Sequence, residues 1–347
     1  GNERTDDKDA ISVVATRDTP RVAANGFETP VTLTGVATYR AAGLYDVAYD
    51  PTDSGTFSLS VKVNGNPIID SPWTLVIQPT YAHAATSTAF EPQLTPVSRV
   101  AATSPTNATA SFTIRAKDRF DNYLALGGDR WVVRAIGPES VVPPMRGLVA
   151  DNSDGSYTAT FQPRKAGPYL VHVGLARARV HVDGLSARYW SNRFMRGEPA
   201  LSRVDPTVDF DWTRAGGDAI GALVTLGWAT MHTSAEWTGF VEPEHPEHYT
   251  FIVTSDDGAR LWVGEQLLID GLDQGPGERS GTTSFRMLPG QLYEVRLQYR
   301  QLTSRPLIRL EWRTHATANT PRAVVPDVAL FPDAPPIKDS PFDFTAT

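Results

Sequence analysis

The chain has 347 residues, of which 41% are hydrophobic and 20% charged, so it can fill more than one hydrophobic core. Its 32 Lys and Arg residues against 39 Asp and Glu residues give a net charge of −7, so we expect no nucleic-acid partner, because such binding relies on a basic face that neutralises phosphates. No apolar run approaches the roughly 18 residues that span a bilayer, and the lack of cysteine excludes disulfides and thiolate metal sites.

Short strands are predicted from the first segment onward. The 27 glycines and 27 prolines interrupt long helices and suit strands joined by tight turns. A strand that starts near Gly43 leads through Pro51 and Gly55 to a second strand, in which every other residue from Phe57 to Val63 is apolar. Alternation of this kind predicts an antiparallel pair with one buried face, as in a β-sandwich.

The pattern of residues 43–63 recurs 112 positions later, in residues 155–175. An alternating stretch over 111–116 precedes the second copy and has no counterpart before the first. We therefore expect two sandwiches in series, of which the first, residues 1–79, lacks its opening strands. Either the chain is a piece of a longer tandem array, or another segment or chain supplies those strands to the open sheet edge.

The closing segment breaks this spacing. Residues 68–73, Ile-Ile-Asp-Ser-Pro-Trp, recur as Ile-Lys-Asp-Ser-Pro-Phe at 337–342, which is 269 rather than 112 positions later. We infer that a separate domain, residues 184–335, is inserted into the last hairpin of the second sandwich, since loop tips tolerate insertion best. The second sandwich then comprises residues 80–183 plus 336–347.

Several motifs of the second copy identify its type. The segment 151–157, Asp-Asn-Ser-Asp-Gly-Ser-Tyr, the segment 166–169, Ala-Gly-Pro-Tyr, and the closing Ser-Pro-Phe resemble the filamin-type immunoglobulin-like repeat. The resemblance implies a seven-stranded sandwich that serves as a spacer or scaffold and contacts neighbouring protein chains through its edges. It also predicts that Phe342 and Phe344 lie beside the strand from Tyr169 to Val173.

The segment between the two parts of the second sandwich also alternates with a period of two, which predicts a further β domain. The predicted strands are 249–253, 261–263, 293–299 and 308–312. Asp257-Gly258 is typical of a hairpin turn between two of them.

The order of motifs in this segment resembles the protective-antigen (PA-14) domain family. The motifs are Val-Asp-Phe-Asp-Trp at 208–212, Trp-Thr-Gly-Phe at 237–240, Ser-Asp-Asp-Gly at 255–258, Leu-Leu-Ile-Asp at 267–270 and Leu-Glu-Trp at 310–312. In that family the domain is often a carbohydrate-binding or adhesive module rather than a catalyst.

Adjacent carboxylates at Asp256 and Asp257 are the candidate ligand site. Neighbouring side chains of a regular strand point to opposite faces, so both reach one cation only where the backbone is bent. In lectin-like members of the family the matching pair does this through a non-proline cis peptide and holds a calcium ion that sugar hydroxyls complete. The resemblance therefore implies a ligand site at Asp256, Asp257 and Gly258, with calcium on the two aspartates. The alternative is a tight turn capped by Asp256, with a structural or protein-binding role.

No hydrolase elbow, zinc-protease motif or phosphate-binding loop occurs, so we expect no catalytic residue and no enzyme activity. The predicted function is that of a modular structural or adhesion protein, extracellular or on a cell surface, whose inserted domain recognises glycans or glycoproteins. The alternative is a scaffold component of a filament, cilium or cytoskeletal assembly that makes only protein contacts.

Overall fold

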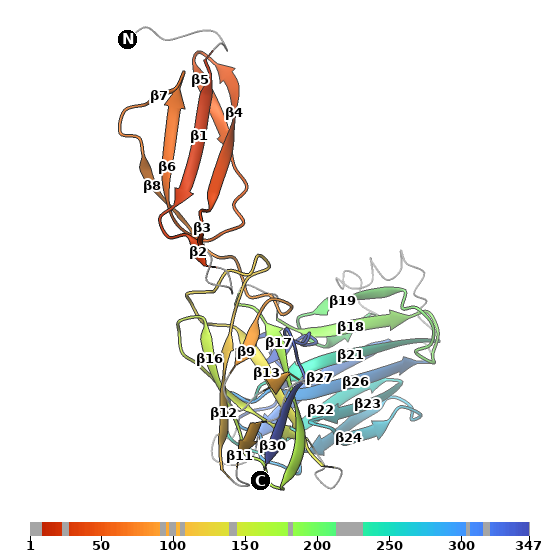
Figure 1. Ribbon diagram of the computed structural model, residues 1–347. Coiled ribbons are helices and arrows are strands. Elements are labelled where there is room, and N and C mark those ends of the chain that lie inside the picture. The colour runs from red at the N-terminus through yellow and green to blue at the C-terminus, as the bar shows by residue number, and fades with distance from the viewer. Residues whose placement is uncertain are drawn as a thin grey trace. The chain divides into compact units, whose positions relative to one another are not determined.

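Figure 1 shows the computed structural model of the chain. It describes residues 9–22, 28–90, 95–96, 102–104, 108–138, 144–179, 183–212, 232–302, 306–314 and 320–346. The chain divides into two compact units, residues 1–80 with 117–124 (unit 1) and residues 81–116 with 125–347 (unit 2). The described elements are strands apart from one short 3₁₀ helix, η1 (Asp327–Ala329), which confirms the all-β prediction. Over the described ranges, no helix has the length and apolarity that a bilayer crossing would need.

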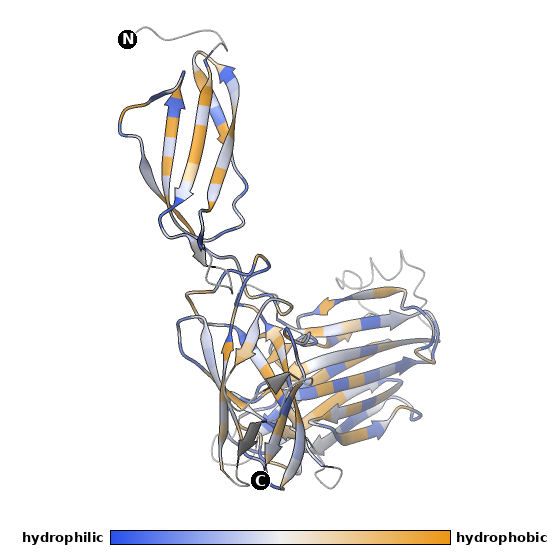
Figure 2. Ribbon diagram, in the orientation of Figure 1, coloured by the Kyte–Doolittle hydropathy of each residue, from blue (hydrophilic) through white to orange (hydrophobic). Residues whose placement is uncertain are grey.

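Unit 1 is built around one antiparallel sheet. Its strands follow the order β5-β4-β1-β6-β7, with β8 beside β6, and β2 and β3 form a separate pair. Apolar and polar residues alternate along β6 (Figure 2), and Val13, Ala15 and Phe57 form the buried core. The strands are β1 (Ile11–Arg17), β2 (Arg21–Val22), β3 (Glu28–Thr29), β4 (Thr32–Ala41), β5 (Leu44–Ala48), β6 (Gly55–Val63), β7 (Asn66–Pro67) and β8 (Trp73–Ile77).

Unit 2 begins with a sandwich of two sheets. One has the order β10-β30-β17-β13-β14, with β11 beside β30, and the other has the order β15-β16-β12-β9. The strands are β9 (Thr88–Phe90), β10 (Thr95–Pro96), β11 (Ala102–Ser104), β12 (Ala110–Arg115), β13 (Arg130–Ile136), β14 (Met145–Arg146), β15 (Leu148–Asp151), β16 (Ser156–Phe161), β17 (Gly167–Arg177) and β30 (Phe342–Ala346).

The last strand of the chain completes this sandwich. In the antiparallel pair of β17 and β30, Tyr169 lies opposite Phe344 and Val171 opposite Phe342. The Phe344 ring packs edge-on against Phe161 of the facing sheet, with centroids 4.9 Å apart. The pairing predicted for Phe342 and Phe344 is therefore confirmed, although the partners lie 171 and 175 positions apart along the chain.

The repeated closing segment makes the same hydrogen bond in both units. In unit 1 the Ser71 hydroxyl accepts a bond from the Val61 amide at 2.9 Å. In unit 2 the Ser340 hydroxyl accepts one from the Val173 amide at 2.9 Å. The sequence repeat is thus matched by an equivalent amide-to-serine hydrogen bond in each of the two units.

Between β17 and β30 the chain forms two further sheets. One has the order β19-β18-β21-β26-β23-β24, with β29 beside β21, and the other has the order β20-β27-β22-β25, with β28 beside β27. The strands are β18 (Leu185–Trp190), β19 (Leu201–Asp205), β20 (Asp209–Asp211), β21 (Thr233–Val241), β22 (Tyr249–Asp256), β23 (Gly258–Val263), β24 (Gln266–Gly271), β25 (Gly277–Thr282), β26 (Tyr293–Gln301), β27 (Leu307–Thr314), β28 (Ala323–Val324) and β29 (Leu330–Phe331).

Tryptophans show which strand faces of unit 2 are internal. Trp131, Trp212 and Trp312 are core residues, at 3%, 5% and 5% exposed. Trp262 differs, because its ring is only half-buried on the outer face of its sheet. The Arg296 guanidinium covers it, with its central carbon 5.1 Å from the ring centroid.

Within unit 2 the sheets of residues 185–331 are attached to the sandwich by more than the chain itself. The Arg146 guanidinium of β14 donates two hydrogen bonds to one oxygen of Glu294, at 2.6 and 3.1 Å. Arg130 of β13 lies 3.2 Å from the Glu242 carboxylate. Phe331 is fully buried in a small apolar cluster at the same junction. These contacts restrict rotation of the sheets of residues 185–331 relative to the sandwich.

Candidate functional site

The predicted site lies at a corner between two sheets. Asp256 is the last residue of β22, and Gly258 is the first residue of β23. β22 pairs with β25 and β27, whereas β23 pairs with β24 and β26, so the chain crosses from one sheet to the other at Asp257. The prediction of a hairpin turn at Asp257-Gly258 is therefore wrong. The peptide bond from Asp256 to Asp257 is cis, as the resemblance to lectin-like members implied.

Polar contacts with the end of β26 fix this corner. Asp257 is 5% exposed, and its Oδ2 accepts a hydrogen bond from the Leu302 amide at 2.7 Å. The Ser255 hydroxyl donates to the Asp257 carbonyl at 2.9 Å. The Tyr299 hydroxyl contacts the Asp256 carbonyl, and burial, followed by the nearby aspartate charges, raises the pKa of Tyr299 well above its usual value. The hydroxyl therefore stays protonated and donates at any physiological pH.

Gly258 leaves no room for a side chain. A Cβ atom there would lie 2.0 Å from the main-chain oxygen of Leu272 and 3.0 Å from that of Gly271. Both are backbone atoms, which cannot rotate away as a flexible side chain would. The corner therefore requires glycine at this position.

Replacing Gly258 by alanine is expected to lower the free energy of unfolding by about 1–3 kcal/mol, because the strands must separate to admit the methyl group. Gly275→Ala is the matched control, since nothing lies within 4 Å of a Cβ at that position and the change is expected to stay within about 0.5 kcal/mol of neutral. Urea denaturation of both variants measures the difference. Equal effects would show that the close approach to Leu272 is relieved elsewhere.

The corner offers the kind of oxygen ligands that calcium prefers. Asp256 and Asp257 bring two carboxylates from consecutive residues, and Ca²⁺ takes about six to eight oxygens, including waters and main-chain carbonyls. Among the residues with described positions, no third His, Asp or Glu completes a metal-binding group. Residues 303–305 of the adjoining loop lie outside the described part of the chain. The two aspartate carboxylates are therefore ligands of the type that calcium prefers.

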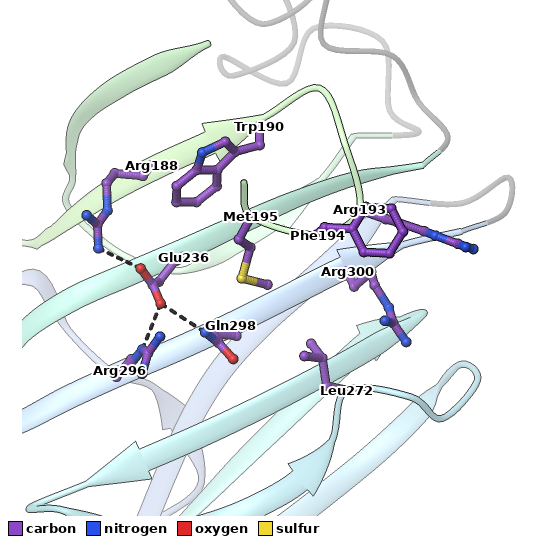
Figure 3. Close-up of a pocket in the computed structure, with 10 residues that line it drawn as sticks. All are labelled: Arg188, Trp190, Arg193, Phe194, Met195, Glu236, Leu272, Arg296, Gln298 and Arg300. Atoms are coloured by element: carbon purple, nitrogen blue, oxygen red, sulfur yellow. Dashed lines mark hydrogen bonds and ion pairs between the residues drawn. The ribbon is translucent and has the colours of Figure 1, made fainter. Parts of the chain in front are cut away.

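A hollow of about 420 Å³ lies beside this corner, on the outer face of β18, β21 and β26 (Figure 3). Glu236 is at its floor and is only 5% exposed. Its carboxylate accepts hydrogen bonds from Arg188 at 2.6 Å, from Arg296 at 2.7 Å and from Gln298 at 3.0 Å. These bonds leave Glu236 ionised: burial alone would raise its pKa, but the hydrogen bonds from Gln298 and Arg296 and the arginine charges outweigh burial and lower it.

The lowered pKa of Glu236 has a defined consequence for stability. The stabilisation is complete above the ordinary value of 4.5 and is lost as the pH falls through the lower pKa of the folded state. We expect the stability difference between the native protein and Glu236→Gln to be largest near neutral pH and to shrink below about pH 4.5. Thermal unfolding across that range measures it. A difference that does not change with pH would contradict the ionised, arginine-bonded state.

Sequence patterns identified the residues of the corner, although they predicted a hairpin turn there, and they did not identify the hollow. Asp256, Asp257 and Gly258 are consecutive, so a local motif identifies them. The hollow combines Arg188, Glu236 and residues of β26, which come together only through strand pairing. The one local signal is the polar alternation at 296, 298 and 300, which marks an outer face.

Comparisons with known proteins agree with this architecture. The family model described as "PA14 domain" matches residues 181–320, and the one described as "Filamin/ABP280 repeat" matches residues 81–184. The class is thus a modular all-β protein. More particularly, the chain contains a filamin-type repeat and a PA14 domain, as the two sequence resemblances predicted.

Individual relatives match parts of the chain. The anti-sigma-I factor RsgI3 of Acetivibrio thermocellus is 33% identical over 157 residues, which are 45% of this chain and 22% of that protein. The E3 ubiquitin-protein ligase TRIM45 of Mus musculus is 33% identical over 93 residues, 27% of this chain and 16% of that one. A solved anti-sigma factor domain-containing protein from Clostridium clariflavum aligns with a TM-score of 0.38 at 18% identity, over 76% and 96% of the two chains. The chain spans less than a quarter of the length of the two curated relatives.

Proposed function

We propose that the chain is a non-catalytic modular adhesion protein of a cell surface or extracellular assembly, with three domains. Residues 1–79 form a filamin-type sandwich, residues 80–183 plus 336–347 form a second one, and residues 184–335 form a PA14-type domain inserted into it. The sandwiches set the spacing, and the inserted domain is the recognition head. The matches to a filamin repeat and a PA14 domain support binding and spacing rather than catalysis.

We place glycan recognition at the corner of Asp256, Asp257 and Gly258. The observation that carries this assignment is the fixed corner, at which Leu302, Ser255 and Tyr299 hold two consecutive acidic residues between the sheets. Asp256 and Asp257 would hold a calcium ion, which supplies positions that sugar hydroxyls can occupy. The residues of the chain orient the two carboxylates, and Gly258 permits the close approach of Leu272.

An array of neutral glycans, probed with and without a calcium chelator, tests this function. We expect binding that the chelator abolishes, and loss of both calcium binding and glycan binding in Asp257→Asn. Asp327→Asn on η1 is the matched control, because it removes an exposed carboxylate remote from the corner in sequence and sheet. Binding that persists in chelator would remove calcium from the function, and binding to none of the neutral glycans would refute recognition at this corner.

One observation favours the alternative of a scaffold that contacts neighbouring protein chains. In unit 1 large apolar side chains of β4 and β5 are exposed, with Val36 at 67%, Leu44 at 63% and Val47 at 40%. Apolar residues along an edge strand such as β5 favour pairing with another chain. Sedimentation velocity would detect such association between copies, and Leu44→Lys is expected to reduce it. A monomer at all concentrations would count against contacts between copies.

A further inference from the structure

The outer face of the sheet that contains β18, β21 and β26 carries an ordered row of polar residues. Tyr189, Trp237 and Leu297 point to the core, so their even-numbered neighbours point outward. The strand registers place these outward residues directly opposite one another across five strands. In order from β18 to β24, the row is Arg188, Glu236, Gln298, Arg260 and Asp270.

The next row explains why a hollow forms here. It runs from Trp190 through Ser234 and Arg300 to Gly258. Serine adds little volume between the large side chains of Trp190 and Arg300, and glycine adds none beyond Arg300, so the surface is depressed along this row. Gly258 also belongs to the Asp256-Asp257 corner, and the hollow therefore ends beside it.

A hydrogen-bonded loop borders the hollow on the side of β18. The Ser234 hydroxyl donates to the Asn192 carbonyl and accepts a bond from the Met195 amide at 3.2 Å. The Asn192 side chain accepts from the Phe194 amide at 3.0 Å and donates to the Arg196 carbonyl at 2.9 Å. The loop is thus fixed before any ligand arrives, which lowers the entropic cost of binding.

The fixed loop presents an aromatic ring and a cation to the hollow. The Phe194 side chain is 57% exposed, and the Arg193 guanidinium lies 4.9 Å from the centre of its ring. Figure 3 shows both across from Arg300. Trp190 and Met195 add further apolar surface on the same side.

Positive charge is in excess in the hollow. Four guanidinium groups, those of Arg188, Arg193, Arg296 and Arg300, line it together with the single carboxylate of Glu236. Glu236 bonds two of them, and Arg300 contacts Asp273, whose side chain is 76% exposed. Within the described ranges Arg193 has no carboxylate partner. A cationic hollow on a chain with a net charge of −7 calls for an anionic ligand.

We propose that this hollow binds an acidic saccharide, one that carries carboxylate or sulfate groups. Guanidinium groups bind both anions through paired hydrogen bonds. Phe194 offers a flat apolar surface to the carbon-bound hydrogens of a sugar ring, while Glu236 and Gln298 can accept hydrogen bonds from its hydroxyls. An acidic peptide would use the arginines but would leave the ring and the hydroxyl acceptors without a matching group. The site needs no metal ion, so it is independent of calcium at Asp256 and Asp257.

Calorimetric titration of the whole chain tests the site. The probes are an alginate oligosaccharide, a sulfated dextran oligosaccharide, unsulfated dextran and hexaglutamate. We expect at least one acidic saccharide to bind, more weakly as salt is added, and Arg193→Glu to weaken it by at least about tenfold. Arg196→Glu is the matched control, because it makes the same charge change in the same exposed loop outside the hollow, and we expect less than a twofold effect.

The remaining outcomes each decide the proposal. Binding of alginate alone or sulfated dextran alone supports it and names the anion. Equal binding of unsulfated dextran, tighter binding of hexaglutamate, or equal losses in Arg193→Glu and Arg196→Glu would overturn it. Arg300→Gln is a second test of the hollow, because Arg300 lies on strand β26 whereas Arg193 lies in the loop. Chelator and Asp257→Asn should leave this binding unchanged, so failure of the calcium site and failure of the hollow can be told apart.

Discussion

Replacing Asp205 by alanine is expected to lower the free energy of unfolding by about 3–5 kcal/mol, since it leaves two buried donors and a half-buried cation without their partner. The Asp205 carboxylate is 2% exposed. It accepts a hydrogen bond from Trp237 Nε1 at 2.8 Å and from the Tyr189 hydroxyl, and it lies 2.6 Å from Arg203. Burial, and then the charge of Asp205, raises the pKa of Tyr189 far above its usual value, so its hydroxyl remains a donor.

Asp209→Ala is the control for this effect. Asp209 is also bonded to an arginine, with Arg309 Nε 2.6 Å from its carboxylate, but the two side chains are 35% and 46% exposed. Pairs that water reaches contribute about 0–1 kcal/mol. Urea denaturation followed by tryptophan fluorescence compares the variants, because Trp237 lies at the site of the change. If Asp205→Ala were no more destabilising than Asp209→Ala, the buried bonds to Asp205 would contribute little.

Local patterns and long-range pairing account for different parts of the molecule. The strands of unit 1 and of the sandwich in unit 2 could be predicted because the repeat places Gly, Pro and aromatic residues at a constant spacing, and such residues act through their own turns and strands. The closing strand could be predicted for the same reason, since residues 337–342 copy residues 68–73. Because no copy of this closing segment follows the second repeat at the expected spacing, the sequence indicated that the chain returns to the sandwich after a separate domain.

The corner shows where local reasoning fails. Asp257-Gly258 has the composition of a hairpin turn, but β23 continues into the other sheet because it pairs with β26, whose first residue lies 35 positions beyond Gly258. No feature of the Asp257-Gly258 dipeptide indicates that the chain continues into the other sheet instead of turning back. The hollow depends on two such pairings at once, so Arg188, Glu236 and Arg300 have no common signature in the sequence.

Phe344→Ala is expected to destabilise the second sandwich by about 3–5 kcal/mol, although this residue follows the PA14 domain and lies three positions from the C-terminal residue. Phe344 is 1% exposed, and its ring contacts Phe161 at 4.9 Å and Tyr169 at 6.1 Å between centroids. If residues 184–335 are an insertion, Phe344→Ala destabilises the second sandwich and leaves the inserted domain stable. Amide hydrogen exchange should then accelerate first in β16 and β17, while β22 and β26 keep their protection.

Phe90→Ala separates this expectation from a general effect of losing an aromatic ring. Phe90 belongs to the same sandwich, on β9, but its side chain is 49% exposed, so its removal leaves little cavity and is expected to cost well under half as much as Phe344→Ala. Exchange that accelerates equally in β17 and β26 of Phe344→Ala would mean that the sandwich and the PA14 domain unfold as one body. The contacts of Arg146 with Glu294 and of Arg130 with Glu242 would then couple the sandwich to the PA14 domain so strongly that neither unfolds without the other.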